Sequence, residues 1–188
     1  MNRLPFAFFI AALLCGLPYL SAHRAIAQSL NDRMSASVKR VYGESAVFSS
    51  ASATLSDKEG ADIKSASGFA YGPTVNYYAV AVGGKRVGYA IVDEVRGKAK
   101  LITYAVFVDN NITIRDLEVL VYREPYGGEI QYDAFRRQFR GKGPKDQYKV
   151  GVDVRNVSGA TISTNAVTGG TRKLIAVLRE LKGAGKLR

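Results

Sequence analysis

The chain has 188 residues and a formal net charge of +11, with 27 lysines and arginines against 16 acidic residues. This length suits one domain with a targeting segment in front of it. The charge favours anionic partners, such as phosphate-bearing cofactors, acidic lipid surfaces or acidic proteins. No long block of lysine and arginine is present, so an ordinary solvated basic surface explains the charge equally well.

The first 27 residues have the features of a signal peptide. Arg3 gives a basic start, residues 4–20 are almost entirely apolar, and Ala25 and Ala27 form the small-residue pattern for cleavage before Gln28. An uncleaved membrane anchor is the alternative, because an apolar run of 17 residues is at the lower limit for a spanning helix. We predict a location in the periplasm or on the extracytoplasmic side of the membrane, which also argues against a nucleic-acid partner.

Cleavage would remove the only cysteine, Cys15, and the only histidine, His23, and would leave a net charge of +9. Such a chain cannot form structural disulfides, cysteine nucleophiles, Ser-His-Asp triads, iron–sulfur clusters or the usual zinc sites. Carboxylate metal sites remain open, but the sequence singles out no metal ligands and no catalytic residues. Redox work by this chain therefore requires an organic cofactor.

After the signal segment, the chain begins with a helix, a strand and a second helix. Apolar residues at helical spacing predict the first helix over 28–45, and weak alternation predicts a strand over 46–55. Ser56 as N-cap, with Glu59 three residues later, predicts a capping box at the start of the second helix. That helix is expected to end near Gly68.

The middle of the chain is rich in strand signals separated by short turns. Turn-forming residues at 83–84, 97–98 and 109–111 interrupt a series of apolar and aromatic runs. These runs predict an antiparallel meander of four strands, over 75–82, 86–95, 101–108 and 112–122.

Two helices are predicted after the meander. The first spans 131–140, with Phe135 and Phe139 one turn apart, and the second spans about 162–182. The second helix has an apolar face that we expect to be buried. This face consists of Val167, Leu174, Ile175, Leu178 and Leu181.

Gly169 and Gly170 are expected to weaken the last helix by ~1 kcal/mol each relative to alanine. Residues 183–188 are expected to fray. The elements together predict an α+β fold, in which helices flank an antiparallel sheet and a single domain follows the signal peptide. Within it, an N-terminal extension over 28–70 packs on the main domain, which spans 71–182.

The segment with the clearest chemistry is 156–164, at the predicted start of the last helix. A helix N-terminus presents unpaired backbone N–H groups and a partial positive charge, which stabilise a phosphate group. The small residues there let an anion approach closely, and Thr161 supplies a hydroxyl group. The alternative is an ordinary N-cap after a glycine turn.

Six of these residues follow one another as Ser158, Gly159, Ala160, Thr161, Ile162 and Ser163. This segment, named the SGAT motif below, resembles the signature of the FMN-binding domain family. That family includes the periplasmic flavin subunits of the sodium-pumping NADH:quinone reductase and of the related Rnf electron-transport complex. The resemblance implies that a separate flavin transferase cleaves FAD and leaves FMN joined through its phosphate to Thr161.

A second segment, 122–130, resembles the glycine-bearing loop that precedes the signature in this family and packs beside the flavin. We name it the glycine loop; two adjacent glycines allow its backbone to approach a flat ring closely. Matching segments in the right order extend the resemblance from about residue 84 to residue 180. It implies that FMN is bound by Glu124, Gly127, Gly128 and the SGAT motif.

Arg155 departs from the family pattern, which usually has an aspartate six residues before the acceptor threonine. The nearest acid is Asp153. An arginine at this position either changes the local charge against attachment or holds a phosphate group. Covalent and non-covalent FMN therefore both remain open.

Aromatic and basic side chains offer further contacts to a flavin or to a partner. Strand packing accounts for most of the tyrosines that are candidates for stacking on the flavin ring. These candidates are Tyr77, Tyr78, Tyr89, Tyr104 and Tyr126. A solvated face is the alternative for the cations that are candidates for docking an acidic redox partner. These cations are Arg136, Arg137, Arg140, Lys142 and Lys145.

The resemblance implies an exported electron-transfer protein that holds FMN and exchanges electrons with membrane or periplasmic redox partners. Such a protein is a carrier or a subunit and not an independent enzyme. Association with the membrane surface is also open. The rival hypothesis is a flavin-free exported binding module of the same fold, which docks an anionic partner or a membrane surface.

Overall fold

The fold is built on a five-stranded antiparallel sheet with the strand order β1-β2-β3-β4-β5. The computed structural model describes residues 17–188, with side chains from Leu30 onward. The predicted four-stranded meander is confirmed, and the strand predicted over 46–55 joins its edge. The strands are β1 (Ala46–Thr54), β2 (Thr74–Val82), β3 (Lys85–Arg96), β4 (Leu101–Asp109) and β5 (Ile114–Val121).

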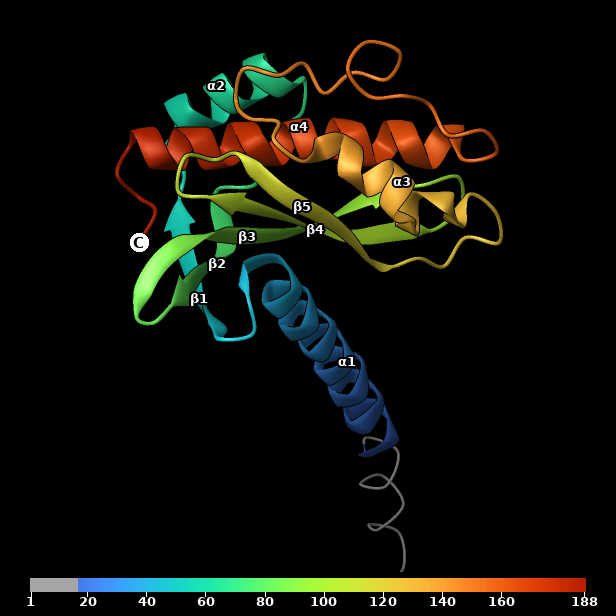
Figure 1. The fold of residues 1–188 in the computed structure, drawn as a ribbon, viewed down its shortest axis with the longest axis horizontal. Helices are drawn as coiled ribbons and strands as arrows, with labels where there is room; N and C mark the ends of the chain where they lie inside the picture. Colours follow the sequence, from blue (N-terminus) through green and yellow to red (C-terminus); the bar gives the residue numbers. More distant parts are fainter. Residues whose placement is uncertain (1–16) are drawn as a thin grey trace, which may run out of the picture.

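Helices cover both faces of the sheet, as the α+β prediction requires (Figure 1). Two of them, α4 and α2, lie above one face, whereas α1 lies on the opposite face and projects away from it. The α-helices are α1 (Leu17–Tyr42), α2 (Asp57–Ser67), α3 (Asp133–Arg136) and α4 (Thr161–Gly183). Two short 3-10 helices flank α3, namely η1 (Gly128–Gln131) and η2 (Arg137–Phe139).

The predicted signal peptide over 1–27 falls largely outside the described residues, which begin at Leu17. The backbone of residues 17–27 forms the first part of α1, and this helix continues past the predicted cleavage point before Gln28. Between Leu17 and Arg188, no helix has the length and apolar character needed to cross a membrane.

Helix α1 packs on its face of the sheet through a small apolar cluster. Met34 and Val38 are buried there together with Phe107 of β4. At the end of the helix, the Tyr42 hydroxyl group lies within 3.0 Å of backbone carbonyl oxygens on β3 and β4. Strand β4 is therefore covered on both faces, which explains the almost unbroken apolar sequence of residues 101–108.

The capping box predicted for α2 is confirmed. Ser56 Oγ accepts a hydrogen bond from the backbone N–H of Glu59, and the Glu59 carboxylate accepts one from the backbone N–H of Ser56 at 2.6 Å. Gly68 follows the last turn with a φ of 80°, the left-handed conformation that often ends helices. Both boundaries of this helix are therefore determined by local sequence.

The helix predicted over 131–140 is wrong in extent. The segment is divided into η1, α3 and η2, and Tyr132 is extended between the first two. Phe135 and Phe139 are both buried and meet edge to face, with their ring centroids 5.2 Å apart. A continuous helix would carry the chain past the sheet, whereas the backbone N–H of Gly141 here donates to a carbonyl of the edge strand β5 at 2.8 Å.

Helix α4 lies directly on β3 and β4, and its predicted apolar face is buried as expected. A Cβ atom built on Gly170 would collide with the Tyr104 hydroxyl group and would lie 2.6 Å from Val95 Cγ1. A Cβ atom built on Gly169 would lie 3.2 Å from the Phe69 ring. The two glycines, expected only to weaken the helix, therefore allow it to approach its neighbours closely.

The prediction that residues 183–188 fray is wrong. Lys186 Nζ lies 2.6 Å from a Glu59 carboxylate oxygen of α2. The Tyr77 hydroxyl group donates to the Lys186 carbonyl at 3.1 Å and accepts from the backbone N–H of Arg188 at 2.9 Å. Because the Tyr77 ring is buried, its hydroxyl group needs hydrogen-bond partners, and the C-terminal tail provides them.

Three of the five cations that are candidates for partner docking form ion pairs within the chain. Arg136 pairs with Glu118, and Arg140 pairs with Asp116. Lys142 lies 3.0 Å from an aspartate carboxylate oxygen. These side chains stabilise the segment around α3, so they are less available to a partner than the sequence suggests.

The buried carboxylate of Asp116 joins three elements, because Arg40 of α1 and Arg140 after η2 both pair with it on β5. Its side chain is only 2% exposed. Burial acts to raise the pKa of Asp116, but the hydrogen bonds from Arg40 and Arg140 outweigh burial and hold this pKa below its usual value. The stability that this carboxylate contributes is present above the pKa of an ordinary carboxyl group and is lost as the pH falls through the lowered one.

We predict that Gly170→Ala destabilises the domain by about 1–3 kcal/mol, since the added methyl group must displace Tyr104 within a packed core. Alanine is the better helix former, so helix propensity alone would have the opposite effect. The measurement is the free energy of unfolding from urea titrations followed by circular dichroism.

The matched control for this prediction is Gly60→Ala in α2, because a Cβ atom built on Gly60 meets nothing within 4 Å. That variant should gain about 0.5–1 kcal/mol of stability. Equal changes in the two variants would contradict the close packing at Gly170.

Candidate functional site

The glycine loop and the SGAT motif come together at Gly127. This residue is buried and has a φ of 83°, in the left-handed region. A Cβ atom built on it would lie 2.8 Å from the Tyr122 hydroxyl group and 3.4 Å from both Ala160 Cα and Ser163 Oγ. Glycine is therefore required here both by backbone conformation and by space.

Tyr122 connects the two segments by hydrogen bonds. Its hydroxyl group donates to the backbone carbonyl of Tyr126 at 2.6 Å and lies 3.1 Å from Ser163 Oγ. Because the phenolic proton is used on the carbonyl, which has no proton to give, Ser163 is the donor in the second bond. Tyr122 directly follows β5 and Ser163 is in the first turn of α4, so this bridge joins the sheet to the helix. Tyr122 lies in the glycine loop, but no pattern in the sequence indicates this bridge.

The start of α4 has no side-chain cap. Its N-cap residue is Ala160, which has no side-chain oxygen and makes no capping bond, so the ordinary serine or threonine cap is not formed. Gly159 precedes it with a φ of 80°, and Ser158 is exposed. The first N–H groups of an α-helix have no partner within the helix. At this helix they follow the small residues 158–160, an arrangement that fits a phosphate group.

Thr161 is the first residue of α4, and it is exposed. Its hydroxyl oxygen accepts a hydrogen bond from Asn156 Nδ2 at 3.0 Å, which leaves the hydroxyl proton available to another acceptor. Asn165 Nδ2 donates to the Thr161 carbonyl at 2.8 Å. The neighbouring Ile162 is 52% exposed. Asn156 lies inside the segment singled out from the sequence, but the sequence alone did not indicate its contact with Thr161.

Glu124 is engaged with the turn between β3 and β4. Its Oε1 accepts hydrogen bonds from the backbone N–H groups of Lys100 at 2.9 Å and Ala99 at 2.7 Å, and these bonds lower the pKa of the carboxyl group. Glu124 therefore fixes the glycine loop to this turn, and its direct contact with a cofactor stays a prediction. Gly128 is half-buried, and its carbonyl accepts a hydrogen bond from Gln131 Nε2 at 3.3 Å.

A groove of about 800 Å³ lies beside the start of α4. Its volume is within the range of about 300–1,000 Å³ that is typical of small-molecule and cofactor sites. One wall is contributed by residues 129–138 and the other by residues 151–158. The lining includes Ser158 of the SGAT motif and two exposed apolar side chains, Tyr132 and Val152.

Two arginines line the groove, Arg137 of η2 and Arg155, the residue that departs from the family pattern. The backbone N–H of Arg155 donates to Gln138 Oε1 at 2.7 Å, which positions the segment that leads into the SGAT motif. Burial acts to raise the pKa of Asp153, but bonds from backbone N–H groups and from Lys142 lower it overall. That carboxylate is thus already paired, whereas both arginines remain exposed.

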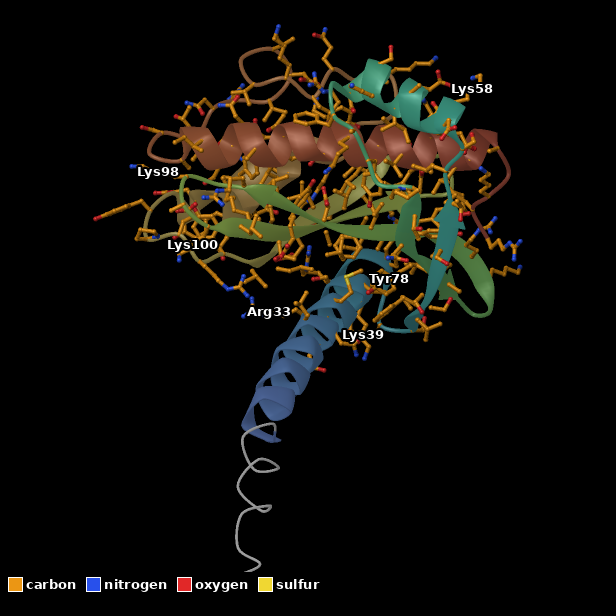
Figure 2. All side chains as sticks on the ribbon, turned by 180° about the vertical axis from the view of Figure 1, so that it is seen from behind. Arg33, Lys39, Lys58, Tyr78, Lys98 and Lys100 are labelled. Carbon is orange, nitrogen blue, oxygen red and sulfur yellow. The ribbon has the colours of Figure 1, made fainter. Side chains whose placement is uncertain are left out.

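One of the five candidate tyrosines lies at the site. The others pack in the sheet, as expected for most of them, and Figure 2 shows Tyr78 beside α1, below the sheet. These four are Tyr77, Tyr78, Tyr89 and Tyr104. Tyr126 belongs to the glycine loop and is 82% exposed. Tyr132, which the sequence did not single out, lines the groove. It lies between η1 and α3, and no periodic pattern in the sequence marks it.

Part of the chain matches the sequence model of a protein family. The model described as the FMN-binding domain matches residues 97–176. The match runs from the turn between β3 and β4 through the glycine loop and the SGAT motif into α4. A search of curated proteins found no match.

We predict that Gly127→Ala reduces bound flavin while the domain stays folded. The methyl group would meet the Tyr122 hydroxyl group and disturb its bond to Ser163. The left-handed conformation costs a residue with a side chain about 1–2 kcal/mol, less than the ~5–15 kcal/mol of a typical domain. The measurement is flavin per folded molecule, together with flavin fluorescence and the thermal midpoint.

Gly141→Ala is the control for backbone strain alone. Gly141 has a φ of 82°, but a Cβ atom built on it meets nothing within 4 Å. Its flavin content should equal that of the wild type, with a similar loss of stability. Equal flavin loss in the two variants, or none in either, would show that the close approach at Gly127 does not hold the cofactor site.

Proposed function

We propose that this chain, which matches the FMN-binding domain family over residues 97–176 and takes FMN as its cofactor, works as an exported electron-transfer protein. The protein is exported, holds FMN outside the cytoplasm, and passes electrons from one membrane or periplasmic partner to another. When bound, FMN supplies one- and two-electron redox chemistry. The chain itself contributes position, an anchor for the phosphate and a controlled environment, and it is not an independent enzyme.

The observation that supports this function best is the meeting of the glycine loop and the SGAT motif at the uncapped start of α4. Thr161 is exposed at the first helical position, and the N-cap residue Ala160 leaves the backbone N–H groups of the first turn without a side-chain partner. A phosphate ester on Thr161 would be stabilised by these groups and by the helix dipole. Arg137 and Arg155 in the adjoining groove add positive charge of the kind that phosphate attracts.

We assign Thr161 as the residue to which a flavin transferase attaches FMN. In that step, the Thr161 hydroxyl oxygen forms a bond to the phosphorus on the FMN side of FAD. The bond between the two phosphates breaks, AMP leaves, and the hydroxyl proton is released. Asn156 supports this role because its amide orients the Thr161 oxygen without using the hydroxyl proton. No electron is transferred during attachment.

Export through the membrane rests on the N-terminal sequence. Arg3, the apolar residues 4–20 and the pattern at Ala25 and Ala27 support cleavage before Gln28. A protein recovered from the cell envelope that begins at Gln28 would support cleavage. A full-length chain that stays with the membrane would support the uncleaved anchor, and a chain found only in the cytoplasm would contradict export.

The flavin-free binding module remains the rival, and the visible spectrum separates the two. Protein purified from its native envelope should show flavin absorbance bands if FMN is bound in the cell. A colourless preparation that is fully folded by circular dichroism would favour the rival.

We predict that Thr161→Ala abolishes covalent flavin without unfolding the domain, because this side chain is exposed and its hydroxyl group makes one side-chain contact. The stability change should stay within about 0.5 kcal/mol. The measurement is intact-protein mass spectrometry after co-production with a flavin transferase in an exporting host. The wild type should gain the mass of FMN in phosphodiester linkage.

Thr74→Ala on β2 is the matched control, because it removes the hydroxyl group of another exposed threonine outside the glycine loop and the SGAT motif. This variant should keep the adduct. An adduct that persists in Thr161→Ala would refute the assignment of the acceptor.

We predict that Arg155→Asp increases the fraction of chains that carry covalent flavin. The substitution restores the acidic residue that the family signature usually has six positions before the threonine. The fraction is read from the same mass spectra at limiting transferase. Arg137→Asp makes the same charge change in the same groove and should not increase attachment. Complete attachment in the wild type would show that Arg155 is harmless.

A further inference from the structure

A cluster of unpaired cations lies at the turn between β3 and β4 and at the start of the glycine loop that is bonded to it. It consists of Arg96, Lys98, Lys100 and Arg123, all exposed, and is named the cationic turn below. Among the described residues, none of the four takes part in an ion pair. This distinguishes them from Arg136 and Arg140 beside α3, whose charges are paired within the chain.

The cationic turn is held directly against the glycine loop. Glu124 follows Arg123 in that loop, and its carboxylate accepts the hydrogen bonds from Lys100 and Ala99 that shape the turn. The same loop reaches the SGAT motif at Gly127. Figure 2 shows Lys98 and Lys100 at one end of the molecule and Lys58 at the opposite end.

Two carboxylates lie within this surface, and both are engaged. Glu124 binds backbone N–H groups of the turn, and it lies close enough to Arg96 for that charge to lower its pKa. Glu94 accepts a hydrogen bond from the Thr103 hydroxyl group at 2.8 Å. The four cations therefore face these two acids, and the surface keeps a net positive charge even with Glu129 of the adjoining glycine loop included.

Exposed apolar side chains occur on the neighbouring strand, in the glycine loop and at the start of α4. Leu101 is 43% exposed at the start of β4, Tyr126 is 82% exposed in the glycine loop, and Ile162 is 52% exposed beside Thr161. An apolar centre with a charged rim is the usual composition of a protein docking surface. Charges on such a rim act mainly on the rate of encounter with a partner of opposite charge.

We propose that the cationic turn, together with Tyr126 and Ile162, is the docking surface for an acidic electron-transfer protein that exchanges electrons with the flavin. This inference rests on the proposed function. A protein partner fits better than a lipid surface, because the apolar side chains flank the cofactor segments themselves and electron transfer requires the partner's redox group to come near them.

The first test measures how the charge of a small oxidant affects the rate at which it oxidises the flavin. FMN-loaded protein is reduced and then oxidised by ferricyanide, an anion, or by tris(phenanthroline)cobalt(III), a cation, in a stopped-flow instrument. Each oxidant accepts one electron, so two are consumed per fully reduced flavin, and the flavin protons pass to the solvent. The variant Lys98→Gln/Lys100→Gln is compared with Lys58→Gln/Lys64→Gln on α2, where Lys58 is 86% exposed.

We expect the Lys98→Gln/Lys100→Gln variant to react with ferricyanide about tenfold more slowly than the wild type at low salt, the lower end of known steering effects. It should react faster with the cobalt complex. Both differences should fade between about 10 mM and 150 mM salt, as the screening length falls from about 30 Å to 8 Å. The Lys58→Gln/Lys64→Gln variant should match the wild type.

The second test needs no flavin. The flavin-free Thr161→Ala protein is passed over an immobilised plant-type [2Fe–2S] ferredoxin, an acidic electron carrier, and binding is measured by interferometry at low and high salt. Binding at low salt that is lost in Thr161→Ala/Lys98→Gln/Lys100→Gln, and kept in Thr161→Ala/Lys58→Gln/Lys64→Gln, supports the docking surface. If the protein proves to carry no flavin in the cell, the proposed function fails, while this binding test still gives its own answer.

Three results would overturn the inference. One is a ferricyanide rate that is equal in all variants at low salt. Another is ferredoxin binding that is absent from the wild-type surface or unchanged by neutralising Lys98 and Lys100. The third is binding to phosphatidylglycerol vesicles that depends on these two lysines while ferredoxin binding does not, which would assign the surface to the membrane.

Discussion

Helix α4 lies so close to the sheet that position 170 has no room for a side chain. A Cβ atom there would collide with Tyr104 and would lie 2.6 Å from Val95 Cγ1. The rest of the site depends on this contact. With the helix held against β3 and β4, its first turn comes within hydrogen-bond range of Tyr122, which follows β5. The core packing therefore determines where the glycine loop and the SGAT motif meet.

The two long helices of the α4 side begin in opposite ways. Helix α2 has a complete capping box between Ser56 and Glu59, whereas α4 begins at Ala160 without a capping side chain. Alanine in place of a good N-cap residue costs about 0.5–2 kcal/mol. The buried face of α4 offsets that cost, because helices in proteins are stabilised mainly by packing. The N–H groups of its first turn, which no side chain caps, are thus available to a phosphate group. The N–H groups at the start of α2 are instead bonded within the capping box.

The sequence was sufficient for features that local chemistry decides. The capping box at Ser56, the turns of the meander and the apolar face of α4 depend on residues close together in the chain, and all were predicted. The loop and motif segments were also recognised, by resemblance. Their contact at Gly127 and the link through Tyr122 join residues that are far apart in the sequence. The spacing of apolar residues therefore could not predict them. The anchored C-terminal tail and the broken 131–140 helix were missed for the same reason, since buried Tyr77 and the β5 edge decide them.

The net charge can be read from the sequence, but the positions of the free charges cannot. A net charge of +11 indicates an affinity for anions but says nothing of where an anion binds. The structure separates cations that pair internally, such as Arg136 and Arg140, from those that stay free, such as Lys98 and Lys100. Paired charges contribute to holding α1 and the α3 segment on β5, where Asp116 is buried. Lys98 and Lys100 lie beside the glycine loop because Glu124 fixes their turn there, so one carboxylate both shapes this loop and presents a positive surface next to it.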